Sequence, residues 1–176
     1  MIRTATVVLC AFGTACAGPV ATHITSSGNG TVEPMALAWA SVPAGKGPSP
    51  AIDGTLRAAV EKALQERGFH FSDDAPAIVS AGFAERPASI SLEGQAGRMV
   101  SDGKKQRLLQ NCQDRMMRVR IALIDRANGE NLYTGNAQES HCHAQAVDVV
   151  DRLASEAVRD IHAPGTDRVE TVLAKD

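Results

Sequence analysis

Two segments of alternating polarity, joined by a short turn, constrain the fold of this chain more than any other feature. Residues 115–125 place apolar side chains at every second position, and residues 131–141 follow after the turn Asp-Arg-Ala-Asn-Gly at 125–129. A period of two is that of a strand with one buried face, and Asn-Gly tolerates the positive φ of a tight turn. The two segments therefore predict an antiparallel β-hairpin.

Four further segments carry regular patterns. Residues 35–42 and 77–85 are typical of strands, and residues 50–68 and 144–161 repeat apolar side chains at helical spacing. These elements predict an α+β fold in one domain over residues 35–164. We expect an antiparallel sheet of about four strands with two helices packed on one face, in the order strand-helix-strand-strand-strand-helix. Residues 165–176 are expected to be a C-terminal tail.

The charge of the chain excludes one class of partner. Its 176 residues include 18 basic and 20 acidic side chains, for a net charge of −2. Because the basic residues are scattered along the chain, they form no electrostatic footprint for nucleic acid. We therefore expect no nucleic-acid partner.

The N-terminal 15 residues resemble a signal peptide. One arginine precedes a short apolar segment that is too short to be a permanent membrane helix. The sequence Gly13-Thr14-Ala15-Cys16 resembles a bacterial lipobox, which predicts cleavage before Cys16 and lipidation of that cysteine. The alternative is an ordinary secretory site at Ala15-Cys16-Ala17, which would release a soluble protein. Residues 16–34 are rich in Gly, Ser and Thr and are expected to be a flexible tether.

Two cysteines remain in the exported domain, and both flank the hairpin. Counting outward from the turn brings Cys112 opposite Cys142, or within one residue of it, which suits the Cα separation of a disulfide. An oxidising compartment would join them. The alternative is a metal site that adds His141 and His143 to these cysteines. Strand alternation turns Cys142 away from both histidines, so the sequence favours the disulfide and predicts no metal.

A long connection over residues 86–111 carries the basic residues Arg98, Lys104, Lys105 and Arg107. Connections of this length are often functional. The basic stretch suits an anionic lipid headgroup or a glycan, and the alternative is a solvated insertion with no binding role. Elsewhere we find no nucleophile elbow, phosphate-binding loop or zinc-protease motif, so we expect no catalytic residue and no cofactor.

Several short pieces, in their order, resemble the bacterial lipoproteins grouped as domain of unknown function 4136. The matching pieces are residues 64–69, 77–83, 121–125 with Gly129, 133–137 and 150–164. The resemblance implies a small α+β domain of the cell envelope. It implies no activity, cofactor or catalytic residue.

Together these features predict a non-enzymatic envelope protein, anchored to the outer membrane through Cys16 and exposed to the periplasm. Ala17 follows the lipidated position where an aspartate would favour the inner membrane. The domain is expected to bind an envelope protein or a glycan. The alternative is a soluble periplasmic enzyme or small-ligand binder that uses residues 86–111 as a lid.

Overall fold

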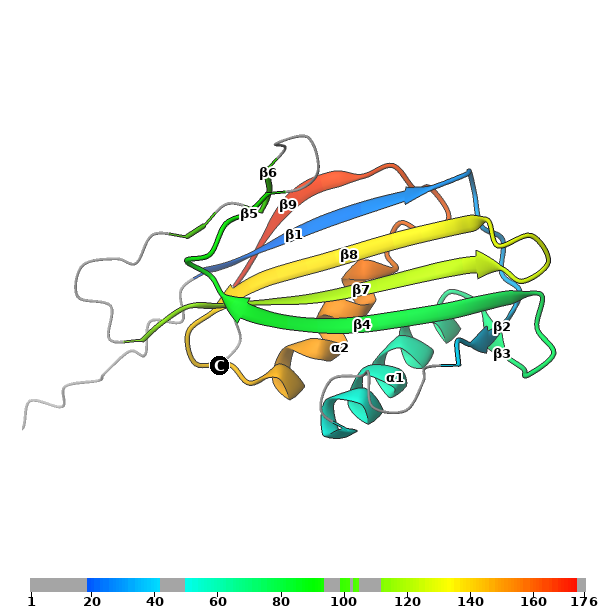
Figure 1. Cartoon of the computed structure of the whole chain (residues 1–176), viewed down its shortest axis with the longest axis horizontal. Helices are drawn as coiled ribbons and strands as arrows, with labels where there is room; N and C mark the ends of the chain where they lie inside the picture. Colours follow the sequence, from blue (N-terminus) through cyan, green and yellow to red (C-terminus); the bar gives the residue numbers. More distant parts are fainter. Residues whose placement is uncertain (1–18, 42–49, 94–98, 102, 105–111, 174–176) are drawn as a thin grey trace, which may run out of the picture.

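In the part of the chain that the structure describes, a seven-stranded sheet and two helices form the fold (Figure 1). The computed structural model describes residues 19–41, 50–93, 99–101, 103–104 and 112–173. The strand order is β3-β2-β4-β7-β8-β1-β9, and β5 and β6 form a separate pair. The elements are β1 (Pro19–Gly28), β2 (Ala36–Trp39), α1 (Pro50–Gln65), β3 (His70–Phe71), β4 (Ala77–Pro87), β5 (Leu92–Glu93), β6 (Met99–Ser101), β7 (Arg115–Asp125), β8 (Asn131–His141), α2 (Ala146–Ala157) and β9 (Asp167–Leu173).

The predicted hairpin is confirmed as the pair β7–β8, which lies in the middle of the sheet. The two strands pair in antiparallel register from Arg115 with His141 to Ile124 with Asn131. In the turn, Oδ1 of Asp125 accepts hydrogen bonds from the backbone N–H groups of residues 127 and 128, and Gly129 has a φ of 73°. Only glycine adopts that conformation at no steric cost, which is why the turn ends there.

The expected four-stranded antiparallel sheet is wrong, because the sheet has seven strands and mixed directions. Strand β2 pairs in parallel with both β3 and β4, whereas β4, β7, β8, β1 and β9 are antiparallel neighbours. Helix α1 lies between β2 and β4 in the chain. A parallel neighbour needs a crossover of this kind, and the crossover helix is what makes the sheet mixed.

Two of the additional strands come from segments that the sequence placed outside the domain. Strand β1 lies within the expected tether over 16–34, and β9 lies within the expected tail over 165–176. Both expectations are corrected for these residues. The inward side chains of β1 are Thr22, Ile24 and Ser26, so only one of the three is apolar. Such a strand has no apolar alternation to detect, and it is specified by backbone pairing with β8 and β9.

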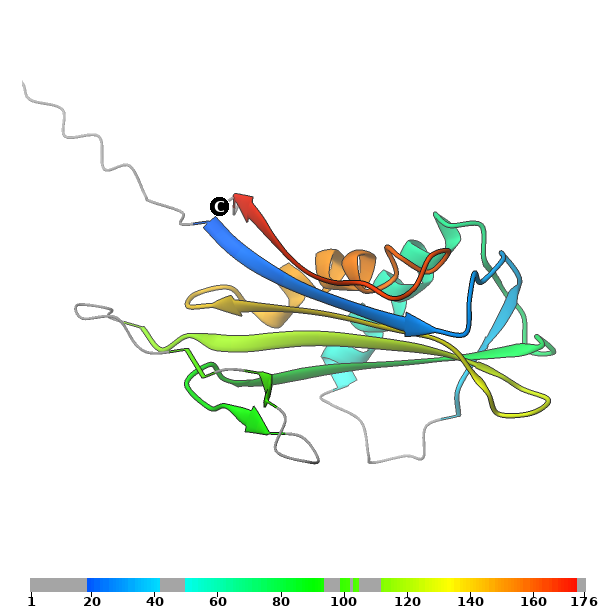
Figure 2. The same cartoon turned by 90° about the horizontal axis from the view of Figure 1, so that it is seen from above.

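Both helices cover the same face of the sheet, and β5–β6 lies on the other side (Figure 2). The apolar stripe expected on α1, from Ile52 to Leu64, is buried as its spacing predicts. In α2 the stripe is displaced at its start, because Val147 is 55% exposed and Val149 is buried instead. No helix within the described ranges has the length and apolar character needed to cross a membrane.

Helix α2 approaches β8 very closely at one glycine. A Cβ atom on Gly135 would overlap the carbonyl oxygen of Ala157 and would lie 2.6 Å from the hydroxyl of Tyr133. That hydroxyl donates a 2.7 Å hydrogen bond to the same carbonyl. Burial raises the pKa of Tyr133. Gly135 and Tyr133 together therefore fix the end of α2 against the sheet.

Candidate functional site

Strand β8 ends where strand β1 begins, at one end of the sheet (Figure 1), and the predicted cysteine pair lies beside the end of β8. Cys112 and Cys142 are joined by a disulfide, with their Cα atoms 5.7 Å apart. Cys142 directly follows β8, and Cys112 lies three residues before β7. Extending the β1–β8 register places Pro19 level with Cys142. The disulfide therefore marks the end of the sheet at which the N-terminal strand enters.

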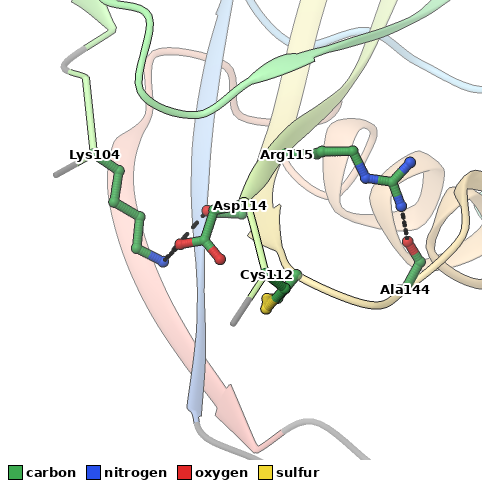
Figure 3. Close-up of a disulfide and its surroundings, with 7 residues drawn as sticks. Lys104, Cys112, Asp114, Arg115 and Ala144 are labelled. Atoms are coloured by element: carbon green, nitrogen blue, oxygen red, sulfur yellow. Dashed lines mark hydrogen bonds and ion pairs between the residues drawn. A yellow bond between two sulfur atoms is a disulfide. The ribbon is translucent and has the colours of Figure 1, made fainter. Parts of the chain in front are cut away.

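Polar contacts hold the segments beside the disulfide (Figure 3). A guanidinium nitrogen of Arg115 donates a 2.9 Å hydrogen bond to the carbonyl oxygen of Ala144, and another lies 2.7 Å from Oε1 of Glu85. On the other side, Nζ of Lys104 lies 2.5 Å from a carboxylate oxygen of Asp114. These contacts tie the connection after β4 and the residues before α2 to the start of β7.

Only one of the four basic residues singled out in the 86–111 connection can be placed. Lys104 is the one whose ion pair with Asp114 is described above. Arg98, Lys105 and Arg107 lie outside the described residues, as do Cys16 and the expected signal segment 1–15. The interaction role of this connection therefore stays a prediction.

The four residues of the alternative metal site do not converge. The sulfur atoms of Cys112 and Cys142 and a ring nitrogen of His143 lie within 4.8 Å of one another, but the two sulfurs are bonded to each other. The ring of His141 is turned away to Glu139, with Nε2 at 2.8 Å from Oε2. A disulfide leaves neither cysteine as the thiolate that a metal ligand requires.

A buried charged cluster lies beneath α2, close to the disulfide. At its centre is Glu139, which is 1% exposed. The hydroxyl of Thr22 donates a 2.5 Å hydrogen bond to its Oε1, and a guanidinium nitrogen of Arg152 lies 2.5 Å from its Oε2. His141 contacts the same oxygen as Arg152. The carboxylate is thus fully partnered, as a buried charge must be.

This cluster was not predicted from the sequence, although the sequence holds one signal for it. Glu139 falls on the same side of its strand as Tyr133 and Ala137, which are buried. A carboxylate in that series predicts a buried acid that needs a basic partner. The partner could not be named, because Arg152 comes from a helix and Thr22 from a strand that the sequence does not reveal.

A groove of about 310 Å³ runs between α1 and α2. Its polar lining comes from Lys62, Glu66, Asp151, Arg152, Ser155 and Glu156. Burial raises the pKa of Glu156, and its Oε2 is buried without a hydrogen-bond partner among the residues that the structure describes. Its Oε1 pairs with Arg159 at 3.3 Å. Arg152 connects this groove to the buried carboxylate of Glu139.

Comparison with sequence families assigns no relative. No family model matches the chain, so the resemblance to domain of unknown function 4136 stays a prediction. No curated protein matches it either.

Several solved structures are similar to this chain at low sequence identity. A PDZ domain protein from Parabacteroides distasonis has a TM-score of 0.57 and 9% identity over 86% of this chain, which spans 38% of that protein. The PelC dodecamer from Paraburkholderia phytofirmans has a TM-score of 0.50 and 10% identity, over 81% of this chain and 99% of that one. A minor lipoprotein from Acinetobacter baumannii follows at 0.40 and 16%, over 73% and 92%. At these identities the first two likenesses show the fold alone, and no argument rests on the third.

Proposed function

We propose that this chain is an exported bacterial envelope protein, anchored to the outer membrane by a lipid on Cys16, whose folded domain is a binding or structural module in the periplasm. The disulfide between Cys112 and Cys142 is the observation that carries the proposal. Structural disulfides persist in oxidising compartments and are rare in the bacterial cytosol. The lipobox-like residues 13–16 would direct export of the chain and lipidation of Cys16, which is the proposed anchor.

The start of β1 limits how far the domain stands from its anchor. Cys16 precedes Pro19, the first residue of β1, by three positions. A fully extended chain covers about 3.5 Å per residue, so the anchor lies within about 11 Å of the sheet. The end of the sheet with the disulfide is then the end nearest the membrane.

Mass spectrometry of the mature N-terminus tests the anchor. We expect a triacylated chain that begins at Cys16, sensitive to globomycin, and partition of the protein into the detergent phase. Cys16→Ala should move the protein to the aqueous phase. Cys10→Ala is the matched control, because it removes the other N-terminal cysteine and should leave the partition unchanged.

Two results would contradict this proposal. Intact protein that begins at Met1 and stays in the cytosol would contradict export itself. A soluble periplasmic protein that begins at Gly18 would contradict the anchor and support the ordinary secretory site. In that second case the compartment inferred from the disulfide would still hold.

A further inference from the structure

The face of the sheet that the helices leave open has an unusual charge. On β4, β7, β8 and β1, the side chains that alternate with the buried ones point to this face, and none of those described is a carboxylate. Three of them are arginines: Arg86 from β4, and Arg118 and Arg120 from β7. The edge strand β9 adds one carboxylate to this face, Asp167, which lies 2.8 Å from Nε2 of His23. Among the described strand residues of this face, the three arginines thus outnumber the one carboxylate.

The two arginines of β7 are close neighbours. They are two residues apart on one strand, which places them about 7 Å apart on the same face. A guanidinium nitrogen of Arg118 donates a 2.6 Å hydrogen bond to Oδ1 of Asn136, and the side chain is half-buried. Arg120 is exposed, and within the described part of the chain neither residue has an ion-pair partner. Burial and the nearby guanidinium groups of Arg120 and Arg86 lower the pKa of Arg118.

The neighbouring strand leaves open space beside these guanidinium groups. Gly82 pairs with Arg120 and Ala84 pairs with Arg118. A Cβ atom on Gly82 would meet nothing within 4 Å, and its φ is not in the left-handed region. Neither a turn nor close packing requires glycine here. A glycine inside a strand weakens it and often marks a place where a ligand approaches the backbone.

On the other side of the arginines lies a row of polar side chains. Nδ2 of Asn136 donates a 3.3 Å hydrogen bond to Oγ1 of Thr25, and Nε2 of Gln138 lies 3.1 Å from Nδ1 of His23. Amides and hydroxyls of this kind both donate and accept hydrogen bonds, as the hydroxyl groups of a sugar do. The open face thus combines cations with hydrogen-bonding groups.

We propose that this open face binds a linear acidic polysaccharide, with Arg118 and Arg120 pairing with its carboxylates and the row from Thr25 to Gln138 contacting its hydroxyl groups. Guanidinium groups bind carboxylates through two parallel hydrogen bonds, which suits this ligand chemistry. The inference deepens the proposed envelope function and rests on it for the site's orientation.

The strand register gives the position of the two arginines along the sheet. Arg118 is level with His23, which is four residues from Pro19, and Arg120 is level with Thr25, which is six residues from Pro19. These positions lie about 13–20 Å along the sheet from the end nearest the proposed anchor.

Binding of polygalacturonate to the mature, detergent-purified protein tests the proposal, with uncharged dextran as the comparison polymer. The double variant R118Q/R120Q should weaken binding by about tenfold or more at low salt. The control variant R57Q/K62Q removes the same charge from α1, on the opposite side of the sheet, and should change the affinity by less than about twofold. Gly82→Leu fills the open space without changing charge and should also weaken binding, and circular dichroism checks that each variant is folded.

Three outcomes would overturn the proposal. The first is that the wild-type protein does not bind polygalacturonate. The second is that R118Q/R120Q and R57Q/K62Q lose the same amount of affinity for it. The third is that the protein binds phosphatidylglycerol vesicles but not the polymer, and that R118Q/R120Q abolishes the binding to vesicles. The measurement uses protein in solution, so its result does not depend on the anchor. A missing lipid on Cys16 would leave polymer binding intact, whereas failed binding would leave the anchor unaffected.

Discussion

The hydroxyl of Tyr133 and the backbone carbonyl of Ala157 form a buried 2.7 Å hydrogen bond between strand β8 and the last turn of helix α2. Both groups lie out of contact with water. Tyr133→Phe removes the donor and leaves the carbonyl without this partner. We expect a loss of about 1–3 kcal/mol in the free energy of unfolding, measured by urea titration. A loss below about 0.5 kcal/mol would show that the bond does not hold the helix.

Gly135 should be the least replaceable glycine of the sheet. A Cβ atom there overlaps the carbonyl oxygen of Ala157, so α2 must move away from β8. We expect Gly135→Ala to cost at least about 1–3 kcal/mol, the usual range for overpacking. Gly82→Ala is the matched control, since its Cβ meets open space, and should be neutral or slightly stabilising. Equal effects of the two substitutions on the melting temperature would contradict the close approach.

The ion pair between Glu139 and Arg152 should be strongly coupled. Arg152→Met leaves a carboxylate that is 0% exposed without its guanidinium partner. We expect a loss of about 2–3 kcal/mol, less than for a fully buried pair because the Arg152 side chain is 33% exposed. Adding Glu139→Gln should recover part of that loss. A double-mutant cycle measures the coupling, and additive effects would show that the two groups act independently.

The disulfide should stabilise the domain mainly by closing a loop. Its cysteines are 30 positions apart, which corresponds to about 3–4 kcal/mol in the chain-entropy model. The Cys112→Ala, Cys142→Ala double variant should lose that amount. Dithiothreitol should lower the melting temperature of the wild-type protein and leave that of the variant unchanged. A thiol titration that finds both cysteines free in the untreated protein would contradict the bridge.

Glu156 should make stability depend on pH. Burial raises its pKa in the folded state, so the stability it contributes at low pH is lost as pH rises through that raised value. We expect the difference in melting temperature, Glu156→Gln minus wild type, to increase as the pH is raised from about 4 to about 7.

Glu170 supplies the opposite control for that experiment. Hydrogen bonds from Arg159 and Arg168 lower its pKa, so its contribution is present at neutral pH and is lost as pH falls through the lowered value. The Glu170→Gln variant should therefore be less stable than wild type at pH 7, and the difference should shrink in acid. The same pH trend for both variants would contradict these assignments.

The parts of the fold that follow from local pattern could be predicted from the sequence. The hairpin β7–β8 and the buried stripe of α1 each depend on a regular apolar spacing, and both are confirmed. Strands β1 and β9 have no such spacing. The inner side chains of β9, Arg168 and Glu170, are stabilised by ion pairs, including Arg168 with Asp160 at 2.5 Å. A strand specified by its neighbours rather than by its own side chains is invisible to periodicity.

The same distinction applies to the candidate sites. Cys112 and Cys142 could be paired in advance because both are positioned by one local hairpin. The surface of Arg118 and Arg120 depends on which strands lie beside β7, and the neighbour Gly82 becomes meaningful only through the β4–β7 register. Nothing in the order of residues places Thr25 beside Asn136, because 111 positions separate them.

The position of β1 also determines when this protein can finish folding. Its first partner, β8, follows it by more than a hundred residues, and its second partner, β9, is the last strand described. Because synthesis runs from the N-terminus, the edge of β1 stays unpaired until almost all of the chain has been made. Closure of the sheet is therefore the last step that its topology allows.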